Sequence, residues 1–281
     1  MKRLTIIIIG VLATLSMSAN RADSLFVVKA LSEARQLPSA TNLPLHFARL
    51  FLGRPYVGHT LEVNDREQLV VNTRQLDCTT LVENVTALTL CARSHRYTFA
   101  DFKQVLTRMR YHDGRLNGYA SRLHYFTDWI IDNTARQIVE ELQQPNPPFT
   151  TIQTINVSYM TTHPQSYKAL KADPSLVPLI RQQEQALNGR RFRYIPKAAI
   201  TNSQLLRTVV GDGDIIAITS SKPGLDIAHL GFAVWRQDGL HLLNASQLHK
   251  KVVEEPMILR QYLQKHPSHT GIRVIRIKNE E

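Results

Sequence analysis

Apolar residues are spaced differently in the two halves of the chain. In the first half they recur every three or four positions, which is the spacing of one face of a helix. This spacing predicts helices, two of them within the first range, at residues 24–53, 79–92, 99–109, 123–142 and 176–187. Later, apolar and polar residues alternate, as in strands that bury one face. This alternation predicts strands at residues 150–160, 192–195, 214–219, 230–236, 240–244, 250–254 and 272–277.

The order of these elements, helices first and strands afterwards, indicates an α+β fold with an antiparallel sheet. Turn sequences separate the strands, among them Gly211-Asp212-Gly213 and Gln237-Asp238-Gly239. The 281 residues can form one large domain or two small ones, and 43% of them are apolar, which is enough for a sizeable core. Because neither an internal repeat nor a flexible linker divides the chain, we expect a single domain over residues 23–281.

The N-terminal 22 residues have the pattern of a secretory signal peptide. Lys2 and Arg3 precede a mostly apolar run from Leu4 to Met17, and small residues follow it. The run is too short and too interrupted for a comfortable membrane span, although an uncleaved anchor is the alternative. We therefore expect residues 1–22 to be removed, and the mature protein to be periplasmic without stable membrane insertion.

Charge and composition exclude several classes of protein. The formal net charge is +11, but the basic residues are scattered rather than clustered, so we expect no nucleic-acid partner. Two cysteines are too few for a disulfide scaffold or an all-thiolate zinc site. The 11 histidines form no His-Glu-x-x-His motif, so we expect no metal and no cofactor. The positive charge suits a partner that carries carboxylates.

The first of the two cysteines lies where a nucleophile would be useful. Cys78 begins a predicted helix, and Asp77 is a plausible N-cap for it. The N-terminus of a helix carries partial positive charge and free N–H groups, so we expect a lowered thiol pKa and donors for an oxyanion. Cys91 lies 13 residues further along the same helix, about 20 Å away, which is too far for a disulfide. We expect Cys91 to be a small buried apolar residue.

A histidine and an asparagine complete a possible catalytic set. His229 begins an apolar strand, and Asn244 ends the return strand of the following hairpin. Simple pairing around the turn places His229 opposite residue 247, so a bulge or a slip of a few residues is needed to bring Asn244 alongside. Asn244 could then hold the imidazole in one tautomer. Cysteine, histidine and an orienting amide form a generalised catalytic triad.

These motifs occur together in an order that resembles a known group of enzymes. The segments that carry the resemblance are Gly53-Arg54-Pro55-Tyr56-Val57, Asp77-Cys78-Thr79, Gly213-Asp214-Ile215-Ile216, His229-Leu230-Gly231 and Asn244-Ala245-Ser246. They resemble the NlpC-type superfamily of papain-like bacterial cell-wall hydrolases. Two further segments, residues 118–129 and 224–229, are similar to the N-acetylmuramoyl-L-alanine amidase-like family within it. The resemblance covers roughly residues 45–277.

The resemblance implies a papain-like core, in which the nucleophile helix packs on an antiparallel sheet. It implies Cys78 as nucleophile, His229 as base and Asn244 as the orienting residue, although the third position is usually histidine and the cysteine is usually followed by Ser-Gly rather than Thr79-Thr80. The wide spacing of Cys78 and His229 indicates a long, mainly helical insertion at about residues 95–205, which forms much of the substrate site.

The same resemblance suggests residues that bind the substrate. They are Tyr56, Asp77, Arg122, His124, Tyr125 and Asp226. Tyr56 could bind the oxyanion or the substrate. Arg122 and His124 could meet sugar or carboxylate groups, or could simply pair with Asp128 or Asp132.

Three functions remain open at this point. The first is a periplasmic amidase that cleaves the bond between N-acetylmuramic acid and L-alanine in peptidoglycan or muropeptide fragments, through an acyl-enzyme. The second is a γ-D-glutamyl-diamino acid endopeptidase with the same triad. The third is a noncatalytic basic binding protein of the cell envelope.

Overall fold

The computed structural model describes residues 21–278. The predicted signal peptide lies outside the described residues except for positions 21 and 22, which begin a helix over residues 21–34. Within the described part of the chain, no helix is both long enough and apolar enough to cross a membrane.

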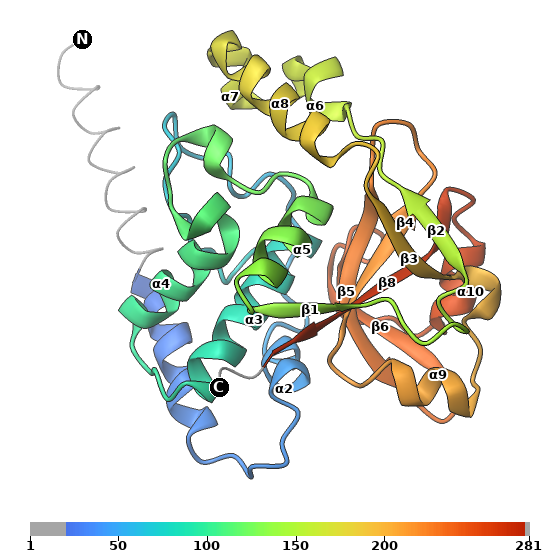
Figure 1. Cartoon of the computed structure of the whole chain (residues 1–281). Coiled ribbons are helices and arrows are strands. Elements are labelled where there is room, and N and C mark those ends of the chain that lie inside the picture. The colour runs from blue at the N-terminus through green and yellow to red at the C-terminus, as the bar shows by residue number, and fades with distance from the viewer. Residues whose placement is uncertain (1–20, 279–281) are drawn as a thin grey trace.

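The helices of the first half surround one long central helix. The remaining helices are shorter and lie in or after the middle of the chain. In chain order they are α2 (Leu43–Arg49), α3 (Cys78–Arg93), α4 (Phe99–Arg110), α5 (Phe126–Ala135), α6 (Tyr159–Thr162), α7 (Lys168–Ala172), α8 (Val177–Leu187), α9 (Gln204–Val209) and α10 (Leu259–Gln264). In Figure 1, α6, α7 and α8 form a separate lobe at the top of the molecule.

Eight strands form one sheet in which every pairing is antiparallel. The strands are β1 (Val139–Leu142), β2 (Thr151–Thr154), β3 (Arg191–Pro196), β4 (Ile215–Ser220), β5 (Ile227–Trp235), β6 (Leu240–Ser246), β7 (Lys251–Glu254) and β8 (His269–Ile277). Their order is β2-β3-β8-β4-β5-β6-β7, and β1 also pairs with β8. The predicted α+β class with an antiparallel sheet is therefore confirmed.

The alternating strand residues bury both faces of this sheet. Ile215, Phe232 and Leu243 face the core that α3 shares with the surrounding helices. Their immediate neighbours, such as Ile216 and Leu242, face a second core that α9 and α10 cover. Because side chains on a strand point alternately to opposite faces, a sheet between two helical layers needs this nearly continuous apolar sequence.

Helix α3 is the central element of the first core. Its N-cap, Asp77, accepts a hydrogen bond from the Thr80 backbone N–H at 2.8 Å, and the Thr80 hydroxyl accepts one from the Asp77 N–H at 2.9 Å. This reciprocal capping box fixes the start of the helix. Every residue from Thr80 to Cys91 is buried, so α3 is apolar around most of its circumference. Cys91 is fully buried in the core, as the sequence predicts.

Two predicted elements end earlier than expected. The helix predicted over 123–142 stops at Ala135, and residues 139–142 instead form β1 beside β8. Gln137, with φ of +59°, makes the turn between them in the left-handed conformation that glycine usually supplies. The strand predicted over 150–160 covers only β2, and α6 begins at Tyr159. Residues 95–205 are mainly helical, but they also add β1, β2 and β3 to the sheet.

Candidate active site

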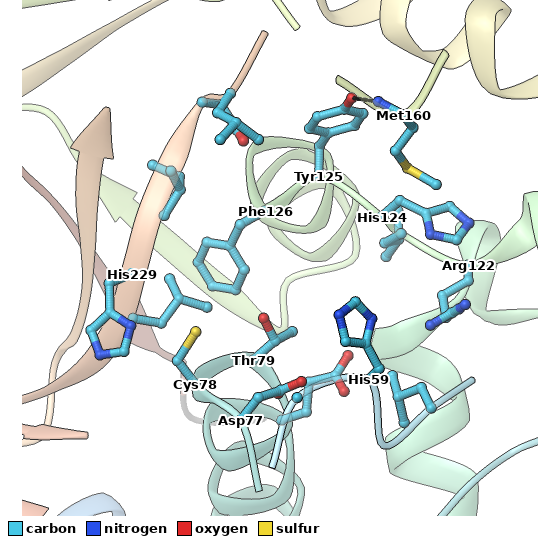
Figure 2. A pocket seen from close by; sticks show the side chains of 18 of the residues that line it. His59, Asp77, Cys78, Thr79, Arg122, His124, Tyr125, Phe126, Met160 and His229 are labelled. Atoms are coloured by element: carbon cyan, nitrogen blue, oxygen red, sulfur yellow. Dashed lines mark hydrogen bonds between the residues drawn. The ribbon is translucent and has the colours of Figure 1, made fainter. Parts of the chain in front are cut away.

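The N-terminus of α3 opens into a pocket of about 360 Å³ (Figure 2). Cys78 is the first residue of the helix and lines this pocket together with His229, which comes from β5. The lining also includes all six predicted substrate-binding residues, Tyr56, Asp77, Arg122, His124, Tyr125 and Asp226. We call this cavity the thiol pocket. Segments far apart in the sequence thus meet where the motifs predict a site.

His229 is held by the predicted asparagine. The Nε2 atom of His229 lies 3.0 Å from Oδ1 of Asn244, whose side chain is fully buried and whose Nδ2 donates to the Leu242 carbonyl at 3.3 Å. An amide oxygen can only accept, so Nε2 carries the hydrogen and Nδ1 keeps its lone pair. Figure 2 shows the His229 ring beside the Cys78 sulfur.

The expected slip between β5 and β6 is wrong. The ladder pairs Phe232 with Leu243, and continuing this register places His229 opposite Ser246. Asn244 is two residues from Ser246 and therefore lies on the same face of the sheet, as a diagonal neighbour that a histidine side chain can reach. Gly231 permits the close approach, because a Cβ atom there would lie 2.6 Å from the Leu243 carbonyl oxygen.

The sequence predicts a lowered thiol pKa at Cys78, and this expectation is wrong. Burial and the nearby Asp77 carboxylate raise the pKa of the Cys78 thiol to about 12. Hydrogen bonds from the Leu230 backbone N–H and from Thr79 lower it, but by less than burial raises it. Burial also lowers the pKa of His229. Desolvation disfavours the charged form of both groups, so the thiol and the imidazole are neutral near pH 7.

Tyr56 lies on the opposite side of the thiol from the sheet core. Its backbone N–H donates to the Lys250 carbonyl at 2.9 Å, and its bridge to Leu76 fixes it next to the start of α3. Burial and the charges of Cys78 and Asp77 raise the pKa of Tyr56 to about 12. The phenol therefore stays protonated and can donate a hydrogen bond into the thiol pocket.

Arg122 is bound by carboxylates other than the two predicted ones. It forms an ion pair with Glu62 and lies 3.2 Å from Glu67. Its guanidinium also lies 5.0 Å from the centre of the Tyr119 ring. The alternative pairing with Asp128 or Asp132 is wrong, because these residues bind His112 and Arg136 respectively.

His124 and Tyr125 form the opposite wall of the thiol pocket. The Nε2 atom of His124 lies 3.0 Å from the Tyr119 carbonyl oxygen, and burial together with Arg122 lowers its pKa well below the ordinary value. The Tyr125 hydroxyl donates to Glu184 of α8 at 2.7 Å and accepts from the Met160 N–H at 3.0 Å. Tyr125 therefore ties this wall to the lobe of α6, α7 and α8.

The two predicted aspartates have structural partners. Asp77 caps α3, as the sequence predicts. Asp226 is buried, and its Oδ2 atom accepts a hydrogen bond from the Thr127 N–H at 2.7 Å, in the first turn of α5. This bond joins the segment before β5 to the start of α5, so Asp226 positions the pocket wall.

Three lining groups were not predicted from the sequence. His59 has a φ of +60° and projects into the middle of the thiol pocket, where Figure 2 shows it between Thr79 and Arg122. Thr79 and the Leu230 backbone N–H contact the sulfur. The position of Thr79 directly after the nucleophile could have indicated its contact. No local sequence pattern marks His59, because its place depends on the loop that precedes α3.

Among residues 21–278, no three His, Cys, Asp or Glu side chains are grouped so that they could hold a metal ion. The chemical character of the site comes instead from a thiol at a helix N-terminus, an oriented imidazole and several hydrogen-bond donors. Such a set defines a candidate nucleophilic site on an α+β fold.

Comparison with known families agrees with the motifs. The model of the N-acetylmuramoyl-L-alanine amidase-like family matches residues 46–272, which include every residue of the candidate site. The chain therefore belongs to this family.

Solved structures show the same fold. A protein from Bacteroides uniformis, named as an N-acetylmuramoyl-L-alanine amidase, is 39% identical with a TM-score of 0.78, over 84% of this chain and 97% of that one. A candidate xylanase from Bacteroides fragilis is also 39% identical, with a TM-score of 0.77, over 83% of this chain and all of the other. A Legionella pneumophila protein is 22% identical with a TM-score of 0.71, over 93% and 96%, and shows the fold alone. A comparison with curated proteins found no match.

Proposed function

We propose that this protein is a cell-wall amidase that hydrolyses the bond between N-acetylmuramic acid and L-alanine. The family and the name of the Bacteroides uniformis relative support an amidase of peptidoglycan. The observation that carries the mechanism is the His229–Asn244 hydrogen bond of 3.0 Å at a pocket that Cys78 also lines. It supplies a nucleophile, a base and a group that orients the base.

In the first step the Cys78 sulfur attacks the lactyl carbonyl of the substrate. The thiol is neutral beforehand, so its proton moves to the lone pair on Nδ1 of His229 as the carbon–sulfur bond forms. Asn244 holds the other ring nitrogen and stabilises the imidazolium. The developing oxyanion can accept hydrogen bonds from the Tyr56 hydroxyl and from the Cys78 backbone N–H, which has no acceptor within the helix.

In the second step the tetrahedral intermediate collapses. His229 returns the proton to the nitrogen of L-alanine, the carbon–nitrogen bond breaks, and the peptide leaves with a free amino group. A thioester to Cys78 remains. Water then attacks it, again with His229 as base, and releases the muramic acid carboxylate and the neutral thiol.

The wall of the thiol pocket opposite Cys78 supports recognition of the sugar. His124, Tyr125, Met160 and Tyr167 line this wall, and they come from the inserted residues 95–205. These groups provide aromatic surface and hydrogen-bonding atoms beside the reacting carbonyl. A closed site of this kind penalises a substrate that lacks the sugar, because polar groups built to bind it are left unpaired.

The carboxylates of the thiol pocket favour this chemistry over sugar-bond cleavage, which the xylanase name of one relative would suggest. A glycosidase needs an acid and a second carboxylate on either side of the scissile bond. Asp77 caps α3, Asp226 caps α5, Glu83 binds the buried Arg110, and Glu62 binds Arg122. Each lining carboxylate thus already has a partner within the fold.

We further propose that the core is papain-like and of the NlpC type, and that the protein acts in the periplasm after cleavage of residues 1–22. A buried nucleophile helix against an antiparallel sheet supports the first proposal. The signal-like N-terminal sequence supports the second. Peptidoglycan or its soluble muropeptide fragments would be the substrate there.

The experiment that tests the function is product analysis with two substrates. The protein should convert N-acetylmuramoyl-L-Ala-γ-D-Glu-diaminopimelate into the free sugar acid and a tripeptide that begins with L-alanine, as identified by mass spectrometry. The sugar-free tripeptide should stay intact. Cys78→Ala should abolish turnover, whereas Cys91→Ala serves as the matched control and should keep it.

Two other results would replace the proposal. Cleavage of the tripeptide at the γ-D-glutamyl bond would establish the endopeptidase. Binding of both substrates without any product, together with full resistance to thiol reagents, would establish the noncatalytic binding protein.

A further inference from the structure

A second cavity, of about 550 Å³, lies on the other side of His229 from the thiol pocket. The two cavities share Leu225, Ile227, Ala228 and His229. Tyr262 lines the second cavity and is close enough to Cys78 for the charge of a thiolate to raise the pKa of its phenol. A substrate whose reacting carbonyl reaches Cys78 can therefore extend into both.

The sheet topology brings distant segments to this second cavity. Ser220 ends β4 and pairs with His269 at the start of β8, and Ile218 pairs with His229 near the start of β5. Lys222 belongs to the turn between β4 and β5, and Lys250 to the turn between β6 and β7. The Lys250 carbonyl binds the N–H of Tyr56, so this turn is tied to the site.

The lining of the second cavity is cationic. It includes Lys222, Lys250, His266 and His269, and none of its lining residues within 21–278 is acidic. The neighbouring Glu255 is buried and lies 3.1 Å from Nε2 of His249, so it does not neutralise the cavity. We call this cavity the basic pocket.

Two stacked histidines form part of the basic pocket. The rings of His266 and His269 lie 4.6 Å apart at 15°. The Nδ1 atom of His266 lies 2.8 Å from the Tyr262 carbonyl oxygen. His269 is 8% exposed, and its Nδ1 atom has no hydrogen-bond partner among the described residues. An unpartnered buried polar atom normally requires an explanation such as a ligand or a bound water.

We propose that the basic pocket binds the carboxylates of the departing stem peptide, while the thiol pocket holds the muramoyl group. This assignment rests on the proposed function, because it orients the substrate of that reaction. The stem peptide carries carboxylates on D-glutamate and on the diamino acid, whereas the sugar side of the scissile bond is neutral. Charge complementarity therefore favours the peptide on the side of Lys222 and Lys250.

The ionisation of His269 supports the proposal. Burial and the cations around it, His266, His229, Lys222 and Lys197, lower the pKa of His269 to about 4. A carboxylate bound in the basic pocket acts in the opposite direction and raises this pKa. The ring of His269 thus provides a spectroscopic reporter for an anion in the basic pocket.

The binding test uses the Cys78→Ala protein, which keeps the pocket and cannot turn over. The probe is the tripeptide L-Ala-γ-D-Glu-diaminopimelate, and its control is the same peptide with all carboxylates amidated. NMR titration should show the pKa of His269 rising with the acidic peptide and unchanged with the amidated one. Lys222→Gln and Lys250→Gln should each weaken binding of the acidic peptide by about threefold to tenfold.

A matched control checks that the effect is local. Lys29 lies on the N-terminal helix, pairs with Glu33, and is 75% exposed. Lys29→Gln removes the same charge and should leave binding unchanged. Equal affinity for the acidic and amidated peptides, or an equal loss in all three lysine variants, would overturn the proposal.

Turnover separates this proposal from the proposed function. With the active protein, amidation of the stem peptide should raise KM for the muramoyl-tripeptide, and Lys222→Gln should raise KM for the acidic substrate only. If the protein never cleaves the muramoyl bond but the acidic peptide still shifts His269, the proposed function fails and the basic pocket stands. If cleavage is normal and insensitive to amidation, only the basic pocket fails.

Discussion

Cys78 and His229 illustrate how burial can outweigh a helix N-terminus. The first turn of α3 favours a thiolate, but the packed surroundings of the sulfur and the Asp77 carboxylate raise its pKa. The imidazole is likewise held neutral. Chemistry at this site therefore starts from an uncharged pair, and the proton must move during the attack rather than before it.

Asn244 should control the ionisation of His229. Its hydrogen bond raises the pKa of the imidazole, so its loss in Asn244→Ala should lower this pKa further. The acidic limb of the kcat/KM profile should then move to lower pH, and the plateau should fall by about tenfold or more, because Nε2–H is left unsatisfied and the ring loses its orientation.

The matched variant is Asn244→Asp, in which a carboxylate accepts the same hydrogen bond. It should move the acidic limb to higher pH, because a neighbouring negative charge favours the imidazolium. If both variants keep the wild-type profile, Asn244 is not the residue that orients the base.

At the scale of elements, the start of α3 serves two purposes that can be separated. Asp77 closes the capping box, which stabilises the helix, and its charge raises the pKa of the adjacent thiol. Stability and reactivity are thus coupled in opposite directions through one side chain.

Two substitutions of Asp77 should uncouple these effects. Asp77→Asn keeps an N-cap acceptor and removes the charge, so the free energy of unfolding should change little. Asp77→Ala removes both and should cost about 1 kcal/mol. Both should speed alkylation of Cys78 by iodoacetamide near pH 7, by about threefold for each unit that the thiol pKa falls.

Peptide mapping after brief alkylation measures this rate, and the buried Cys91 is the internal control, since it should remain unlabelled in every variant. Slower labelling of Cys78 in both variants would show that the Asp77 charge does not suppress the thiolate.

The whole molecule places two cavities on either side of one histidine. The first core positions α3 and the thiol, the second core supports β5 and β6 from the opposite face, and the lobe of α6, α7 and α8 closes one wall through Tyr125 and Glu184. The site therefore depends on all of these layers, and we expect the stability of the fold to respond to groups at the pocket.

Acid should destabilise the protein partly through His124. Its pKa is lowered in the folded state, so below about pH 6.5 the unfolded chain binds more protons than the folded one. The free energy of unfolding should then fall as pH falls, by up to about 1.4 kcal/mol per pH unit from this residue. Denaturant melts of His124→Gln between pH 7 and pH 5 should show a shallower decline.

A substitution of the exposed His163 provides the control and should keep the wild-type slope. An unchanged slope in His124→Gln would mean that the imidazole is protonated in the folded protein as readily as in the unfolded one.

The sequence by itself determined the local features of this protein. Alternating apolar residues predict β4, β5, β6 and β8 to within a few residues, and helical spacing predicts α3, because burial of a strand face or a helix imposes a short-range period. The cap at Asp77, the cysteine at position 78 and the buried Cys91 follow from the same local rules. The motifs also predicted that Cys78, His229 and Tyr56 line a common site.

Features that depend on contacts distant in sequence could be found only in the tertiary structure. Residues 139–142 have the apolar spacing of a helix but form β1, because β8 offers an edge with unpaired backbone groups. The partners of Arg122 are set by the loop before α3, and the reach from His229 to Asn244 by the diagonal of a β ladder.

The ionisation of Cys78 shows the same division. A helix N-terminus is visible in the sequence, but desolvation depends on every layer packed around the sulfur. The basic pocket likewise exists only because β4, β5, β6 and β8 place their ends together. Local periodicity selects the elements, whereas long-range packing decides which side chains meet and which of them carry charge.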